Sequence, residues 1–250
     1  MINRVLAAGF SAGLLVGLAI AVLQQFTTSP LILKGEVYEA ATVGSTPAEH
    51  AHEGPHSHSA ADHDHDEGEG WKPREGFERI AVTSLATVAA SIGYSLLLLA
   101  SMLLNGSDIA KPQTLAFAAC GFVATGLAPA MGLAPELPGS AAGPLVARQV
   151  WWVFTVAATV ASLWLLLSSK RPVAIFAGSV LLALPHAIGA PQPAAFESKA
   201  PAELAAEFAA TSLGLQALLW ASIGLAVAGL WPLFERAAPA DDKLFERASP

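Results

Sequence analysis

Residues 80–104, IAVTSLATVAASIGYSLLLLASMLL, run for 25 residues without a charged side chain. An α-helix rises about 1.5 Å per residue, so this stretch is long enough to cross a hydrocarbon core of about 30 Å. Inside that core every backbone N–H and C=O group must be bonded within the protein, which a helix achieves by itself. The stretch therefore predicts a transmembrane helix.

Five other stretches of the chain have the same apolar character. They lie at residues 5–26, 113–131, 150–168, 173–190 and 212–234. Pro129 and Pro185 interrupt two of them, so five spans is the alternative to a count of six. We predict an all-α integral membrane protein, a polytopic bundle of five to six transmembrane helices. The first stretch is interpreted as a retained helix, with a cleaved signal peptide as the alternative.

Composition supports a membrane protein and excludes several other classes. Hydrophobic residues make up 54% of the 250-residue chain and charged residues only 13%, against about 25% in ordinary soluble domains. The net charge of −7 comes largely from one acidic loop, so no nucleic-acid partner is expected. Cys120 is the single cysteine and lies within an apolar stretch, where it can form no internal disulfide.

The polar residues gather in one long segment after the first predicted helix. Residues 27–78 contain few large apolar side chains after Val43, so we expect a largely disordered extramembrane loop. The chain thus divides into a first transmembrane helix (1–26), this loop (27–78), a bundle of four to five further helices (79–234) and a cytoplasmic tail (235–250).

Basic residues near the predicted spans indicate the orientation. Lys170 and Arg171 occupy a short loop, and the carboxy-terminal tail is basic where it leaves the membrane. Because lysine and arginine in short loops favour the cytoplasmic side, we expect both termini in the cytoplasm. The long loop then faces the periplasm of a bacterial inner membrane.

Six of the seven histidines fall within sixteen residues of that loop. They form three His-x-His pairs interleaved with Asp and Glu: His50 and His52, His56 and His58, and His63 and His65. Imidazole and carboxylate ligands together suit divalent first-row transition metals. The tract is therefore predicted to collect such an ion, and a solvated acidic linker is the alternative.

Loops that follow the first, third and fifth spans must share one side of the membrane. On the side of the histidine tract this places a further set of candidate metal ligands, namely Glu136, His186, Gln192, Glu203 and Glu207. Four of the five have a simpler interpretation. Glu136, flanked by prolines, suits a plain turn whose glutamate faces water, and His186 suits a lone histidine capped by a carbonyl. The two later glutamates suit the amino-terminal turn of a helix.

The fourth span opens with a polar and aromatic group. Arg148, Gln149, Trp151 and Trp152 fit an anchor at the membrane surface. Beyond them, the sequence contains no nucleotide-binding loop, no His-Glu-x-x-His motif and no nucleophile motif, so no enzyme is expected. A single intramembrane histidine gives no bis-histidine haem site, and no permanently bound cofactor is predicted.

Several segments together resemble one known family, CbtA, a cobalt transporter subunit of bacteria. They are 31–39 (LILKGEVYE), 127–139 (LAPAMGLAPELPG), 148–152 (RQVWW), 184–193 (LPHAIGAPQP) and 201–208 (PAELAAEF), together with the His/Asp/Glu-rich loop. By motif, Glu136, His186 and Gln192 carry over first, and Glu203 and Glu207 second. Their roles as metal ligands are our inference.

The resemblance implies uptake of a divalent cation beside a small one-span partner, CbtB. Co(II) is the expected substrate, with Ni(II) or Zn(II) as alternatives, and the bilayer is the other partner. Two other functions use the same residues: metal efflux or resistance, and a membrane subunit that binds or senses the metal without moving it.

Overall fold

The computed structural model describes residues 2–43, 73–74, 76–195 and 198–236, and all regular secondary structure in these ranges is helical. The elements are α1 (Ile2–Phe26), α2 (Thr28–Val43), α3 (Phe77–Leu104), α4 (Lys111–Phe122), η1 (Val123–Leu127), α5 (Ala128–Ala130), α6 (Leu145–Ser168), α7 (Pro172–Ile188) and α8 (Ala202–Arg236). Five stretches among them are long and apolar enough to cross a membrane. The predicted polytopic helical membrane protein is confirmed.

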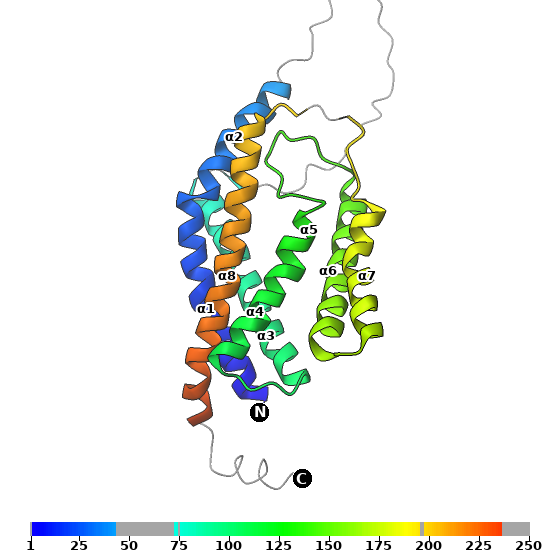
Figure 1. The fold of residues 1–250 in the computed structure, drawn as a ribbon. Coiled ribbons are helices and arrows are strands. Elements are labelled where there is room, and N and C mark those ends of the chain that lie inside the picture. Colours follow the sequence, from blue (N-terminus) through cyan, green and yellow to red (C-terminus); the bar gives the residue numbers. More distant parts are fainter. Residues whose placement is uncertain (1, 44–72, 75, 196–197, 237–250) are drawn as a thin grey trace, which may run out of the picture.

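The fifth predicted span, α7, is shorter than the others. Its 17 residues extend about 25 Å, at the lower limit for a membrane-spanning helix. Figure 1 shows α7 beside α6, and it shows that α1 begins and α8 ends at the same end of the bundle. An even number of traverses is needed for that arrangement, so α7 counts as one of six.

The core of the bundle lies where α1 meets α3 and α8. Ala8 and Ala12 of α1 are fully buried, and Leu99, Ile223 and Val227 from α3 and α8 pack into the same cluster. Small residues on α1 let the helix axes approach closely, which is the usual means of helix association in a membrane. Large apolar side chains on the outer faces remain exposed, as expected where lipid surrounds them.

The α6 and α7 helices form a hairpin that is set apart from this core. Ser162 Oγ donates to the Gly178 carbonyl at 2.7 Å, and Trp151 Nε1 donates to the Pro185 carbonyl at 3.3 Å. Within the described residues, the hairpin meets the rest of the bundle mainly through η1 and α5 against α6. Residues of α6 and α8 line a cleft between the hairpin and the rest of the bundle.

The segment after α1 differs from the sequence prediction. Residues 28–43 form α2, although the sequence predicts a largely disordered loop from residue 27 onward. Pro30 lies in the first turn, where its missing N–H costs nothing. The helix is held by contacts that are distant in sequence: Leu31 is buried, and Glu36 accepts a 2.8 Å hydrogen bond from Arg79 of α3.

Three segments that are far apart in the sequence meet at one end of the bundle. A small cluster joins Leu31 of α2, Leu137 and Ala200, with Leu204 and Phe208 of α8 against it. The Lys199 N–H donates to the Gly139 carbonyl at 3.1 Å. Gly139 has a φ of 81°, a conformation that other residues rarely adopt. The described parts of the loops after the first, third and fifth spans thus lie at one end, as predicted, and we call this end the loop end.

Candidate metal pathway at the loop end

The third span is irregular where it approaches the loop end. It changes from α-helix to π-helix over Val123–Leu127 and then continues to Pro129, which has no N–H to donate. Short π-helical turns are frequent at functional sites because they displace side chains and backbone groups from regular register. Thr125 Oγ1 donates to the Gly121 carbonyl at 2.8 Å and accepts from Trp220 Nε1 at 3.1 Å.

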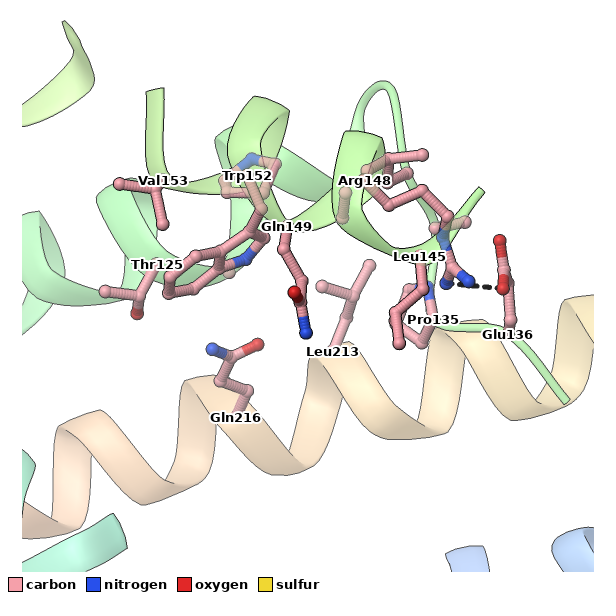
Figure 2. A pocket seen from close by; sticks show the side chains of 15 residues that line it. Thr125, Pro135, Glu136, Leu145, Arg148, Gln149, Trp152, Val153, Leu213 and Gln216 are labelled. Atoms are coloured by element: carbon pink, nitrogen blue, oxygen red, sulfur yellow. Dashed lines mark ion pairs between the residues drawn. The ribbon is translucent and has the colours of Figure 1, made fainter. Parts of the chain in front are cut away.

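A cleft of about 600 Å³ lies between this irregular span, α6 and α8, and we call it the inner cleft. Its polar side chains are those of Thr125, Glu136, Arg148, Gln149 and Gln216. Figure 2 shows the amides of Gln149 and Gln216 pointing toward one another from α6 and α8. Neither amide makes a side-chain hydrogen bond to another described residue, so both are available to a ligand or to water.

Glu136 and Arg148 form an ion pair at the mouth of the inner cleft. Arg148 Nη2 lies 2.5 Å from Glu136 Oε2, and both side chains are about three-quarters buried. Figure 2 shows the pair beside Pro135 at the opposite end of the cleft from Thr125. Arg148 Nε is buried and has no hydrogen-bond partner among the described residues. The guanidinium is thus only partly satisfied by its carboxylate.

A second cleft, of about 770 Å³, opens on the loop side of the first, and we call it the outer cleft. Residues within 132–143, residues 191–193 and 198–202, and the first turns of α8 contribute to it, including Gln192 and Lys199. Leu133, Ala134, Pro135 and Glu136 line both clefts. This short segment therefore separates the outer cleft from the inner one.

The inner cleft ends near a buried aromatic group. Trp220 follows Gln216 by four residues on α8 and is 4% exposed. Its ring lies so close to Gly121 that a side chain at that position would overlap it, and its centroid is 5.0 Å from that of Tyr94. The packing of α3, α4 and α8 around Trp220 thus closes the bundle on the side away from the loop end.

Comparison with protein families matches residues 2–232 to CbtA, described as a probable cobalt transporter subunit. The chain belongs to the CbtA family. No curated protein and no solved structure matches this CbtA-family chain in the corresponding searches. The match covers α1 and every span after it, so the predicted resemblance is confirmed along nearly the whole chain, and the description as a subunit implies at least one partner.

Among the described residues, the structure brings two of the predicted site residues of this CbtA protein to one cleft and leaves the other three apart from it. Glu136 and Gln192 line the outer cleft together. His186 lies in the last turn of α7 against Trp151, with ring centroids 6.1 Å apart, and lines neither cleft. Glu203 and Glu207 are exposed on α8. The six tract histidines lie outside the described residues.

No preformed metal site of three or more His, Cys, Asp or Glu side chains exists within the part of the chain that the structure describes. A metal passing through this CbtA protein would therefore meet single carboxylate, imidazole and amide groups in succession. Such an arrangement suits an ion that keeps most of its water ligands.

Sequence analysis missed three members of the site. Arg148 and Gln149 were assigned to membrane anchoring, and Gln216 received no role. A signal was present for each, because a charged or amide side chain inside an apolar stretch is expensive unless it serves a cavity or a partner. The pairing of Arg148 with Glu136 carries no local sequence signal, since the loop 137–144 separates the two residues along the chain.

Proposed function

We propose that this protein is the membrane subunit of an uptake transporter for a divalent transition metal, with Co(II) as the substrate and Ni(II) or Zn(II) as weaker competitors. One observation carries the proposal: two clefts in the membrane-spanning bundle of a CbtA-family chain meet at a single carboxylate, Glu136. Carboxylate, imidazole and amide groups are acceptable ligands for a borderline cation such as Co(II).

Capture begins at the histidine tract, residues 50–65. The described residues that flank the tract support this position, because Glu36 of α2 is paired with Arg79 at the start of α3. The described ends of the segment that carries the tract, α2 and the start of α3, are thereby held together. Neutral imidazoles on a flexible segment bind divalent metals with modest affinity, which raises the local concentration of the ion without trapping it.

Transfer then proceeds from the tract to Glu136 and His186 at the loop end, with Gln192 as an auxiliary oxygen ligand. Glu203 and Glu207 lie four residues apart on the exposed first turns of α8 and add negative charge around the entrance. Passage continues between the helices. With both termini in the cytoplasm and the loop end outside, a membrane potential favours entry by about 2.3 kcal/mol per charge per 100 mV.

The partner is a small one-span subunit of the CbtB kind, in the bacterial inner membrane. Coexpression with it is therefore part of the test. Radioactive cobalt uptake is measured in cells with wild type, a deletion of residues 50–65, and the double variant Glu136→Ala with His186→Ala, each with nickel and zinc competition. Loss of uptake in the double variant and a smaller loss in the deletion are expected.

Two outcomes lead to other functions. Cobalt sensitivity on loss of the gene, with no loss of uptake, indicates efflux. Metal binding to the purified protein without flux in liposomes that also contain the partner indicates a binding or sensing subunit. Either result, with the protein confirmed in the membrane, overturns the uptake proposal.

A further inference from the structure

Glu136 occupies a position that no other charged residue in the described chain shares. It lines both clefts, at the end of the segment 133–136 that separates them. Glu136 is therefore the one carboxylate, among the described residues, that an ion can meet from either cleft. Yet the carboxylate is already neutralised by Arg148, which approaches from the first turns of α6 (Figure 2).

The ion pair has the features of a contact that can be exchanged. Three-quarters burial strengthens the attraction of Glu136 for any cation, because water screens it less. At the same time, Arg148 Nε is buried without a partner among the described residues, which lowers the net gain from the pair. A competing cation at Glu136 therefore gains a strong attraction, while the Arg148 pair that it displaces is weakened by the buried Nε.

We propose that Arg148 is a tethered counter-ion that holds Glu136 until a divalent cation displaces it, and that this exchange selects divalent over monovalent cations. The inference rests on the proposed function, because it concerns the same route. A monovalent ion offers Glu136 one charge, as Arg148 does, but it must also overcome the high effective concentration of a side chain attached to the same protein. A divalent ion offers twice the charge.

Once Arg148 is displaced, the ion can move on to the side chain of the next residue, Gln149. Gln149 follows Arg148 in α6, and its amide faces that of Gln216 across the inner cleft (Figure 2). Two neutral amide oxygens bind a hydrated dication more weakly than a carboxylate does. The ion is therefore released onward once Arg148 returns to Glu136.

The test is cobalt binding to the purified full-length chain in detergent, measured by calorimetry in NaCl. All six tract histidines are replaced by alanine in every sample, so that the tract does not dominate the signal. In this background Arg148→Gln is expected to bind Co(II) about tenfold more tightly, the equivalent of one lost charge–charge competitor. Na⁺ is expected to compete more strongly than before. Arg148→Lys keeps the charge and should stay near the parent affinity.

Two variants and one measurement of folding serve as controls. Arg171→Gln removes an exposed cation between α6 and α7 and should leave affinity unchanged. Glu136→Gln combined with Arg148→Gln should show no gain in Co(II) affinity, and neither should Glu136→Gln alone. Melting temperatures establish that each variant is folded. Unchanged or weaker binding in a folded Arg148→Gln protein overturns the inference and makes the pair a structural contact.

Failure of the transport proposal is distinguishable from failure of this one. A tenfold gain in binding by Arg148→Gln, in a protein that gives no uptake in cells, supports the exchange at Glu136 and rejects transport. Normal uptake by wild type, with no change in binding when Arg148 is replaced, supports transport and rejects the exchange.

Discussion

At the scale of single residues, His186 shows how a packing role and a ligand role can be separated. Its ring meets the edge of Trp151 at 71°, and Trp151 Nε1 is bonded to the adjacent Pro185 carbonyl. An aromatic replacement keeps this packing but removes the ring nitrogens. We expect His186→Phe to retain the melting temperature of wild type and to lower initial cobalt uptake at least about tenfold, as loss of a metal-associated histidine commonly does.

His186→Ala provides the comparison for that experiment, because it removes both the packing and the nitrogens. It should lower uptake and melting temperature together. Full uptake by the phenylalanine variant would assign His186 to packing on Trp151 alone.

Gln216 tests the inner cleft in the same way. Its side chain packs against Gly126 of η1 and lines the inner cleft. Gln216→Leu keeps a similar volume and removes the oxygen. Because a hydrogen bond to a charged group contributes about 1.5–3 kcal/mol, uptake should fall about tenfold or more. Leu213→Ile, in the same cleft, should leave uptake unchanged, and equal uptake by both variants would remove the amide from the route.

The residue scale also marks the limit of what the sequence can tell about the site. Glu136 and Gln192 stand out because prolines flank them, and the structure brings both to one cleft. Arg148 escapes prediction because its carboxylate lies in a preceding loop, and only the folded chain brings them within 2.5 Å. A membrane-surface position explains an arginine equally well, so composition does not distinguish the two roles.

At the scale of helices, the α1–α3 interface depends on glycines at a four-residue spacing. A Cβ atom on Gly13 would overlap the backbone of Ile92, and one on Gly17 would lie 2.8 Å from the Val88 Cα. Side chains cannot yield there, because backbone atoms are the obstacle. Gly13→Leu should therefore separate the helices and destabilise the protein by at least about 1–3 kcal/mol, the usual cost of overpacking.

Thermal unfolding in detergent measures that effect, with Gly93→Ala as the matched control. Gly93 lies in α3, and a Cβ added to it meets nothing within 4 Å. The control should melt with wild type, or slightly above it. A Gly13→Leu protein that also melts with wild type would show that α1 does not pack on α3 as described.

The helical elements themselves are largely predictable from the sequence, and the exceptions have physical causes. An uncharged stretch of membrane length has few alternatives to a helix, so the predicted spans lie within or close to the observed ones. Helix α2 is different. Its sequence shows no regular spacing of apolar residues, and contacts with Leu137 and Arg79 hold the helix in place. The π-helical turn likewise has no sequence signature apart from the nearby Pro129.

At the scale of the whole molecule, the bundle consists of a tight core and a loosely attached hairpin. Helices α1, α3, α4 and α8 share one buried cluster, while α6 and α7 meet the other described helices mainly at η1 and α5. The inner cleft lies on the boundary between these two parts. Motion of the hairpin against α8 is therefore the least costly way to open or close the route, since it disrupts few buried contacts.

The division into core and hairpin predicts that a covalent link across the inner cleft stops transport. The inner cleft stops before Trp220, which is packed on Gly121 and Tyr94 of the tight core, so onward passage requires the hairpin to move relative to α8. A covalent link between α6 and α8 should prevent this motion. In a Cys120→Ala background, the pair Gln149→Cys with Gln216→Cys is treated with a short bifunctional thiol reagent whose link a reductant cleaves. Cobalt uptake should be lost on linking and should return on cleavage to the level of the untreated double variant.

Each single cysteine, treated identically, controls for mere blockage by the reagent. Undiminished uptake by fully linked protein would mean that the ion crosses without relative motion of the hairpin and α8.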